Sequence, residues 1–264
     1  MLNPRRAVQQ SIRQVHVRWL DRGLPGKVAV YLHSLEAGQR PAFCELVRYF
    51  QASGYEFCDP GAFVAASSGK QIFLSFDDNY RSWYESAELF DQLGIRATFY
   101  LNTAVLRDAA SSQEIENYYD RVGHGGKRVP LSTSELREVA AGGHVIGCHT
   151  HSHVLLTSLP LAEAQGEILT GKRQLEDILG SPVTHFSYPF GMRRHFSEAL
   201  RHYCLGLGFQ TIANAIPGMQ HCPQKAGGIN RSPWALDRPL GYNLQNLAAD
   251  GSLFARLTGR SAVT

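Results

Sequence analysis

Short apolar segments alternate with amphipathic helical segments along most of this chain, and this alternation restricts the fold more than any other feature. Segments of strand length are rich in β-branched and aromatic residues, and patterns of helical period separate most of them. Such an alternation is typical of a parallel sheet covered by helices. The seven predicted strands are residues 28–32, 71–76, 95–101, 144–147, 184–188, 209–213 and 228–231.

The helical segments carry apolar residues three or four positions apart and have recognisable ends. An apolar stripe over residues 43–50 is closed by Gly54, residues 132–135 form a capping box, and a long stripe covers residues 161–178. Residues 102–131 are rich in Ser, Asn and Gly, and we expect them to form an excursion outside the core.

The chain has 264 residues, and no repeat, low-complexity tract or long linker divides it. Hydrophobic residues make up 44% and charged residues 19%, which is ordinary for a chain that folds throughout. We therefore expect an α/β fold in a single domain. The pattern leaves open whether its parallel sheet is open or closed into a barrel.

The composition argues against several classes of partner. The 26 Lys and Arg against 23 Asp and Glu give a formal charge of +3, too dispersed for a nucleic-acid surface. The longest apolar stretches are of strand length, so we expect no membrane span. Five cysteines without a Cys-x-x-Cys pair indicate neither a disulfide framework nor a thiolate zinc site. The first twenty residues lack the apolar region of a secretory signal, so the cytoplasm is the expected compartment.

Two adjacent carboxylates, Asp77 and Asp78, directly follow the predicted strand 71–76. The carboxyl ends of strands are where α/β folds build their sites. Two neighbouring acids repel each other there unless a cation, a proton or solvent is close, and a metal would supply the cation. The alternative is that one of the two carboxylates only caps the helix that follows.

Three histidines stand within five residues, at positions 149, 151 and 153, again directly after a predicted strand. Imidazole is the commonest metal ligand in proteins. In a turn or helical conformation His149 and His153 share a face and His151 points away, whereas in an extended strand all three lie on one side. One carboxylate and two imidazoles would leave a metal such as zinc an open position for water, as in hydrolytic sites. The alternative is a solvated polar loop.

These segments resemble the motifs of the polysaccharide deacetylase family, carbohydrate esterase family four, which contains the chitooligosaccharide deacetylase homology domain. Phe76-Asp77-Asp78-Asn79-Tyr80 resembles the family's Thr-Phe-Asp-Asp-Gly-Tyr motif, and His149-Thr150-His151-Ser152-His153 resembles its His-[Ser/Thr]-x-x-His motif. Tyr188-Pro189-Phe190-Gly191 is similar to the third motif, in the variant with Tyr-Pro in place of Arg-Pro-Pro. Shorter similarities extend the resemblance over about residues 27–232, and they are Tyr31-Leu32-His33, Gly54-Tyr55 and Arg96-Ala97-Thr98-Phe99-Tyr100.

The resemblance implies a distorted (β/α) barrel of about seven parallel strands. We assign residues 27–264 to this domain and residues 1–26 to an N-terminal extension. The implied activity is that of a metal-dependent hydrolase, which removes an N-acetyl or similar acyl group from an amino-sugar-containing saccharide or glycan precursor. The implied metal ligands are Asp78, His149 and His153, the expected divalent metal is zinc, and the implied catalytic base is Asp77.

The resemblance also assigns roles to the segment Tyr188–Gly191. The backbone N–H of Phe190, which follows Pro189 as the family's oxyanion residue does, is expected to stabilise the oxyanion that develops during amide hydrolysis. Tyr188, Pro189 and Gly191 then complete the turn that holds this N–H beside the substrate. The alternative is that Tyr188–Gly191 only ends a strand.

Three departures from the family pattern affect the expected site. Asn79 replaces the usual Gly, which we expect to matter little because Asn tolerates a left-handed conformation. Ser187 stands where many members carry the Arg that orients the base, and we expect Arg231 to approach Asp77 instead.

The third departure concerns the proton donor, because the Leu-x-His motif that carries it in the family is absent. We expect His33, at the end of the first strand, to lie in the pocket and His221 to be peripheral. If neither histidine acts, Asp77 itself returns its proton to the leaving amine. Two other functions stay open: a barrel amidohydrolase whose ligands are a His-x-His pair, and a non-catalytic relative that binds saccharide.

Overall fold

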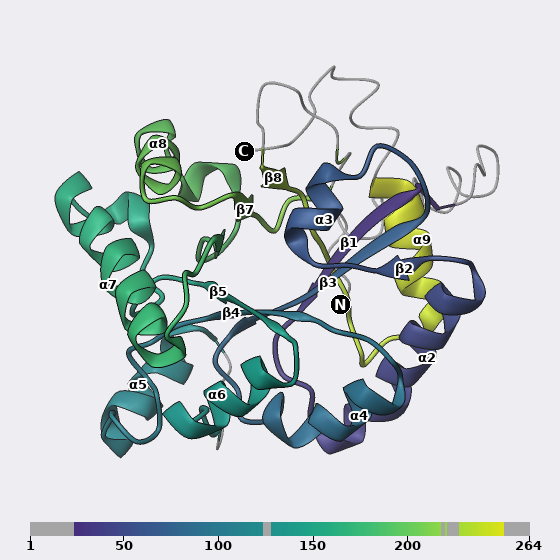
Figure 1. The fold of residues 1–264 in the computed structure, drawn as a ribbon, viewed down its shortest axis with the longest axis horizontal. Coiled ribbons are helices and arrows are strands. Elements are labelled where there is room, and N and C mark those ends of the chain that lie inside the picture. The colour runs from purple at the N-terminus through teal and green to yellow at the C-terminus, as the bar shows by residue number, and fades with distance from the viewer. Residues whose placement is uncertain (1–23, 124–127, 218–219, 221–226, 251–264) are drawn as a thin grey trace, which may run out of the picture.

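The computed structural model describes residues 24–123, 128–217, 220 and 227–250, and its centre is one curled sheet of parallel strands (Figure 1). The strand order is β8-β7-β6-β5-β4-β3-β1-β9, and β2 pairs with β3. This architecture confirms the expected α/β class and the parallel sheet curled into a half-barrel. The strands are β1 (Lys27–Leu32), β2 (Glu56–Phe57), β3 (Gln71–Asp78), β4 (Thr98–Leu101), β5 (Val145–Cys148), β6 (His185–Ser187), β7 (Thr211–Ala213), β8 (Gly228–Ile229) and β9 (Ser232–Pro233).

Helices surround the sheet, with α2, α4 and α9 at one side and α7 and α8 at the other (Figure 1). The helices are α2 (Arg40–Ala52), α3 (Pro60–Ala65), α4 (Ala87–Gln92), α5 (Ser112–Arg121), α6 (Thr133–Ala141), α7 (Leu161–Leu179), α8 (Glu198–Gly206) and α9 (Leu240–Asp250). Four short 3₁₀ helices are η1 (Ala37–Gln39), η2 (Tyr84–Ser86), η3 (Leu156–Ser158) and η4 (Arg193–His195). In the described part of the chain, no helix is both long and apolar enough to span a membrane.

The central strand β3 is held by aromatic packing. Phe76 is fully buried and stacks on Phe99 of β4, with the ring centroids 5.2 Å apart, and Trp83 stacks on the same ring at 4.8 Å. Burial of each such side chain stabilises the fold by about 1.5–3 kcal/mol. Because Phe76 is fixed in this way, the two carboxylates that follow it emerge at a defined place on the sheet.

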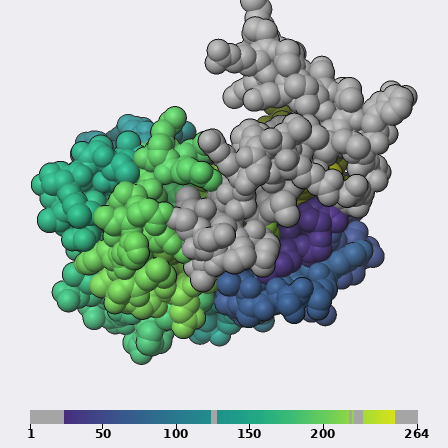
Figure 2. All heavy atoms as spheres, turned by 90° about the horizontal axis from the view of Figure 1, so that it is seen from above, coloured from purple at the N-terminus to yellow at the C-terminus, as the bar shows by residue number. Residues whose placement is uncertain are grey.

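One short segment joins the two edges of the sheet. Gly228–Ile229 pair with β7, and after only Asn230 and Arg231 the chain pairs with β1 through Ser232–Pro233. The prediction of one strand over residues 228–231 is therefore wrong, because the chain has to cross between the two edges at this point. On the same side of the molecule, the blue surface near α3 approaches the green surface near β7 (Figure 2), and α3 packs against β7 and β8.

Two further expectations need correction. Part of the segment expected outside the core belongs to it, because Tyr118 and Tyr119 of α5 are buried and donate hydrogen bonds to Asn102 Oδ1 and to the Asn79 carbonyl oxygen. The strand predicted over residues 95–101 begins at Thr98, because the Ile95 N–H bonds the Phe90 carbonyl oxygen at the end of α4. The division into residues 1–26 and 27–264 stays a prediction.

Candidate active site

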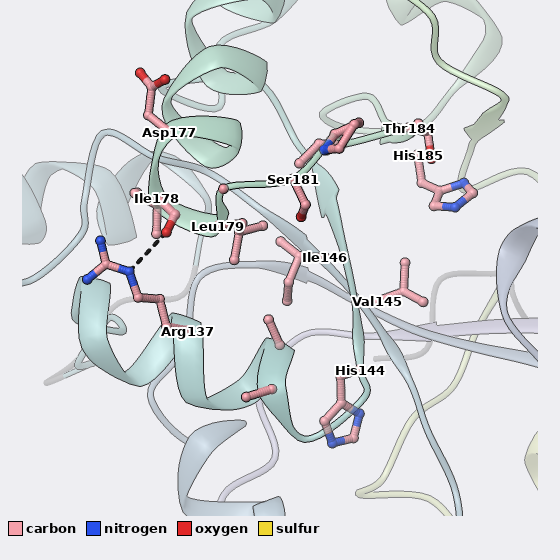
Figure 3. A pocket seen from close by; sticks show the side chains of 15 residues that line it. Arg137, His144, Val145, Ile146, Asp177, Ile178, Leu179, Ser181, Thr184 and His185 are labelled. Carbon is pink, nitrogen blue, oxygen red and sulfur yellow. Dashed lines mark hydrogen bonds between the residues drawn. The ribbon is translucent and has the colours of Figure 1, made fainter.

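Two hollows formed by described residues lie at opposite ends of the sheet. The larger, of about 720 Å³, lies at the amino ends of β5 and β6 between α6 and α7, where Arg137 Nε donates to the Ile178 carbonyl oxygen (Figure 3). The smaller, of about 120 Å³, is lined by Asp77, Asp78 and other residues at the carboxyl ends of the strands. Despite its smaller size we take this second hollow as the candidate site, because parallel α/β folds bind ligands at that end.

Asp78, His149 and His153 converge at this pocket. One potential ligand atom from each residue lies within 4.8 Å of the other two, and all three side chains are buried. Asp78 Oδ1 is 3.3 Å from His153 Nε2 and 3.6 Å from His149 Nε2. The Tyr80 hydroxyl donates to the other oxygen of Asp78 at 3.4 Å, so Oδ1 is the atom that faces the two imidazoles.

Both imidazoles can offer a lone pair to a metal. His149 Nδ1 lies 2.7 Å from the Ser187 carbonyl oxygen, which can only accept, so Nδ1 carries the proton and Nε2 is free to coordinate. Burial lowers the pKa of His153 to about 4, so this ring is also neutral near pH 7. The buried Nδ1 of His153 has no hydrogen-bond partner among the described residues.

The donor set fits a divalent cation. The carboxylate oxygen and the two imidazole lone pairs are all electron-rich, so they repel one another when no proton lies between them. A cation bound between the three atoms removes this repulsion. One carboxylate and two imidazoles form a set that zinc accepts, with room for a further ligand. The three residues are therefore a possible metal site.

The loop after β5 adopts the turn that separates His151 from the other two histidines. The rings of His149 and His153 are 5.1 Å apart, whereas His151 Nδ1 lies 2.9 Å from Thr103 Oγ1. Thr150 and His153 have φ angles of 68° and 57°, and these left-handed residues reverse the chain between the histidines. This geometry gives no support to a metal site built on a His-x-His pair.

Strained backbone is concentrated at the pocket. The non-glycine residues with positive φ in the described ranges are Asp78, Thr150, His153 and Phe190, at 83°, 68°, 57° and 62°. Each such conformation costs on the order of 1–3 kcal/mol and persists only where the surroundings enforce it. The left-handed residue is thus Asp78 and not Asn79. The expectation that Asn79 replaces Gly because Asn tolerates a left-handed conformation is therefore wrong. The buried Asn79 side chain instead accepts from the Leu131 N–H and donates to the Asn102 carbonyl oxygen.

Asp77 forms a bidentate ion pair with Arg231. Arg231 Nη1 and Nη2 donate to the two carboxylate oxygens of Asp77, each at 2.7 Å. The remaining N–H groups of Arg231 donate to the Ser75 hydroxyl, the Ser187 hydroxyl and the Asn214 carbonyl oxygen, so all five guanidinium donors are used. The approach of Arg231 to Asp77 is the one that the sequence predicts.

The surroundings of this pair keep Asp77 ionised. Burial would raise the pKa of Asp77, but the charge and hydrogen bonds of Arg231, together with His149 and His33 nearby, outweigh burial and hold the pKa below its ordinary value. The guanidinium lies between the rings of Tyr31 and Tyr100, 4.9 Å and 5.2 Å from their centroids. The small side chain of Ser187 is a hydrogen-bond acceptor for Arg231 at the position where many relatives carry Arg.

The segment Tyr188–Gly191 forms a tight turn at the rim of the pocket. The Gly191 carbonyl oxygen accepts from the Ala215 N–H at 3.0 Å and from the Tyr188 hydroxyl at 3.1 Å. Gly191 has a φ of 59°, and a Cβ at this position would collide with Ala215. Pro189 is buried, whereas the Phe190 ring is half exposed and lies 4.9 Å from the His153 ring.

His33 and His221 are the two candidates for the proton donor, and the structure describes the position of His33 alone. His33 lines the pocket directly after β1, where we expect a proton donor, and its carbonyl oxygen accepts from Trp83 Nε1 at 2.7 Å. His221 lies outside the described residues, so its predicted peripheral position is untested.

Sequence reasoning did not assign to Tyr31, Asn102 and Tyr118 the contacts that they make at the site. Tyr31 lines the pocket and covers Arg231, while Asn102 and Tyr118 form hydrogen bonds behind the ligand loops. A signal existed for Asn102, because it directly follows a predicted strand as Asp77 does. No local signal existed for Tyr118, whose partner is 16 residues away.

Comparison with known proteins identifies the family. The profile described as polysaccharide deacetylase matches residues 65–212, which is more than half of the chain. The chain belongs to the polysaccharide deacetylase family. It is therefore a hydrolase of the amide deacetylase type, and its substrate class is saccharides.

Relatives from two organisms agree with this family membership. The polysaccharide deacetylase YxkH of Bacillus subtilis (strain 168) is 22% identical over 226 residues, which cover 81% of this chain and 73% of the relative. A chitin deacetylase of Pestalotiopsis sp is 30% identical over 157 residues, which cover 58% of this chain and 44% of the relative.

Solved structures share the fold. The deacetylase PplD of Streptococcus pyogenes, solved in complex with acetate, superposes with a TM-score of 0.67 at 15% identity, covering 85% of this chain and 98% of that chain. IcaB from Ammonifex degensii superposes with a TM-score of 0.68 at 19% identity, covering 85% and 97%.

Proposed function

We propose that this deacetylase is metal-dependent and acts on an N-acetyl or similar acyl group of an amino-sugar-containing saccharide or glycan precursor. The proposed ligands are Asp78, His149 and His153, and the proposed metal is zinc. The observation that carries the proposal is the convergence of these three donors beside the ionised Asp77. Two neutral imidazoles and one carboxylate are a donor set that zinc prefers in hydrolytic sites.

The pocket residues then divide the hydrolysis of the amide between them. A bound divalent cation would supply Lewis acidity, which lowers the pKa of water and polarises the amide carbonyl group. Asp77, ionised and oriented by Arg231, would accept the proton of the attacking water. The Phe190 N–H would donate to the oxygen that becomes negative in the tetrahedral intermediate, and the turn made with Tyr188, Pro189 and Gly191 would hold it in place.

The leaving amine needs a proton because an amide anion is a poor leaving group. We propose His33 as its source, since this imidazole lines the pocket at the end of β1 and an imidazole suits proton transfer near neutral pH. If His33→Gln retains the wild-type rate, the proton that Asp77 accepts from water is the remaining source within the pocket.

The wider assignments are proposals of the same kind. We assign residues 27–264 to the catalytic domain and residues 1–26 to an extension. We propose a cytoplasmic location and no nucleic-acid partner, on the composition of the chain.

Metal analysis of three single variants tests the proposal. We expect His149→Ala and His153→Ala to lose most of the bound metal and the release of acetate from N-acetylated chitooligosaccharides. His151→Ala is the matched control, because its ring bonds Thr103, and it should keep its metal. Equal loss of metal at all three histidines would refute the ligand set. Metal binding without acetate release from any N-acetylated sugar would favour the non-catalytic saccharide-binding alternative.

A further inference from the structure

Asn102 lies between the two loops that carry the proposed metal ligands. It is fully buried and directly follows β4. Its backbone N–H donates to the carbonyl oxygen of Asp78, the last residue of β3, at 3.1 Å. Its side-chain amide donates to the His149 carbonyl oxygen, with Thr150 O and Oγ1 each at 3.4 Å, on the loop after β5.

The orientation of the Asn102 amide is determined by its partners. The His149 and Thr150 carbonyl oxygens can only accept, so the NH₂ end must face them. The oxygen end accepts from the Tyr118 hydroxyl at 2.8 Å. Both ends of the Asn102 side chain are thus hydrogen-bonded, and the Tyr118 hydroxyl, on α5, holds the amide against the loop after β5.

Both segments in contact with Asn102 have strained backbone. Asp78, at the end of β3, and Thr150, in the loop after β5, have φ angles of 83° and 68°, conformations that persist only where neighbouring groups enforce them. Thr150 extends this contact to His153, because its Oγ1 accepts from the His153 N–H at 3.2 Å. Asn102 is therefore connected to Asp78 through its backbone N–H, and to the loop that carries His149 and His153 through its side chain.

We propose that Asn102, supported by Tyr118, is a positioning residue whose side chain holds the His149–His153 loop at the separation from the Asp78 end of β3 that metal binding needs. The inference rests on the proposed function. Asn102 is not among the residues that line the pocket, so its influence on the metal passes through the backbone of this loop. Removal of its side chain should release the loop after β5 and weaken metal binding more than the loss of fold stability explains.

Asn243 of α9 provides a matched control. It is also buried, and it also uses both ends of its side chain, because Oδ1 accepts from the Ala235 N–H at 3.0 Å and Nδ2 donates to the Ala235 carbonyl oxygen at 2.9 Å. Its partners contact none of the three ligand residues. Asn243→Ala therefore measures what the loss of a buried asparagine does to stability alone.

The experiment is a titration of the metal-free protein with Co²⁺, followed by ligand-field absorption, together with the melting temperature of each metal-free variant. We expect both Asn102→Ala and Asn243→Ala to lower the melting temperature. Only Asn102→Ala should raise the Kd for Co²⁺, on the order of 10–100-fold, and alter the absorption bands. Asn102→Asp should weaken binding at least as much, because its carboxylate would face two carbonyl oxygens. Tyr118→Phe should raise the Kd by a smaller factor.

Three outcomes decide the matter. A folded Asn102→Ala that binds Co²⁺ with the wild-type Kd and spectrum overturns the inference. If Asn102→Ala does not fold, Tyr118→Phe decides, and an unchanged Kd there overturns it equally. A wild-type protein that binds no Co²⁺, or a His149→Ala variant that binds it as well as the wild type, refutes the proposed metal site itself.

Discussion

Asp77 and Asp78 are neighbours in the sequence with opposite electrostatic surroundings, and this difference separates their proposed roles. Asp77 has both oxygens on the guanidinium of Arg231, whereas Asp78 has one oxygen on a tyrosine hydroxyl and the other facing two imidazoles. A carboxylate paired with a permanent cation stays ionised, as a base must be before it accepts a proton. One that faces only neutral lone pairs is suited to hold a metal.

Replacement of each carboxylate by its amide should separate the two roles. Asp77→Asn keeps the shape but cannot accept a proton, so acetate release should fall by on the order of 10²-fold or more while metal content persists. Asp78→Asn should lose metal and activity together. Metal content by mass spectrometry and acetate release from the same preparations check both, with circular dichroism to show folding. Metal loss confined to Asp77→Asn would reverse the assignment.

Single residues were predictable where they directly follow a strand. Asp78, His149 and His153 could be placed in one cluster because segments that resemble the family's motifs carry them at strand ends. Arg231 could be placed beside Asp77 because Ser187 stands where the resemblance implies an orienting Arg. Asn79 was misjudged, because its role depends on contacts with Leu131 and Asn102, far away in the sequence. Such long-range hydrogen bonds leave no local pattern.

At the level of elements, strand β5 has a proposed metal ligand after one end and a histidine with a structural role before the other. His149 follows its carboxyl end, and His144 precedes its amino end beside the hollow in Figure 3. His144 Nδ1 accepts from the Ala97 N–H at 3.1 Å, which ties β5 to the start of β4. Its ring packs 5.0 Å from that of Phe90 and 5.2 Å from that of Phe99.

The buried ring of His144 makes the fold sensitive to acid. Burial, with a contribution from Arg96, lowers the pKa of His144 from 6.5 to about 4. The unfolded chain then binds this proton more readily than the folded chain, so stability is full above pH 6.5 and is lost as the pH falls towards 4. Between pH 7 and pH 5 the loss should be about 2 kcal/mol.

Urea unfolding of the wild type and His144→Gln at both pH values checks this prediction. The glutamine oxygen can accept from the Ala97 N–H but does not titrate, so the variant should lack this part of the acid sensitivity. Contributions of other groups, including His153, are common to both proteins and cancel in the difference. The same pH dependence in both proteins would contradict the prediction.

Long helices and strands were predictable from local sequence patterns. The predictions were wrong where tertiary contacts determine the structure. The buried strands and the capping box before α6 follow from residue types and spacing. The burial of α5 did not, because its Ser- and Asn-rich surroundings are typical of a loop. The rings of Tyr118 and Tyr119 pack into the core, and their hydroxyls bond Asn102 and Asn79, which follow β4 and β3.

At the scale of the whole molecule, closure of the sheet and assembly of the site depend on the same segment. Residues 228–233 pair with β7 and with β1, and Arg231 at the crossing projects inward to Asp77. The sequence predicts the sheet and the approach of Arg231 but not this connection, because strands of two residues have no detectable periodicity. The ion pair between Arg231 and Asp77 therefore joins residues 228–233 to β3.

Removal of Arg231 should consequently affect stability and activity together. Arg231→Met leaves the carboxylate of Asp77 buried without its cation, and the free energy of unfolding should fall by about 3–5 kcal/mol. The double variant Asp77→Asn/Arg231→Met has no buried charge at this place, so it should recover part of that loss while remaining inactive. The matched control is Arg238→Met, because this guanidinium is exposed, with Nε 3.7 Å from Asp237 Oδ2 and its carbon 5.9 Å from the Tyr242 ring centroid. It should change stability by no more than about 0.5 kcal/mol.

Urea denaturation and acetate release measure these differences in the wild type, the two single variants Asp77→Asn and Arg231→Met, the double variant and Arg238→Met. Recovery of stability in the double variant without recovery of activity would show that Arg231 balances the charge of Asp77 in the fold and that the Asp77 carboxylate is needed for the reaction. An Arg231→Met variant with the wild-type free energy of unfolding would contradict the coupling between closure and the site. A double variant less stable than either single variant would also contradict it, because the two charges would then stabilise the barrel independently.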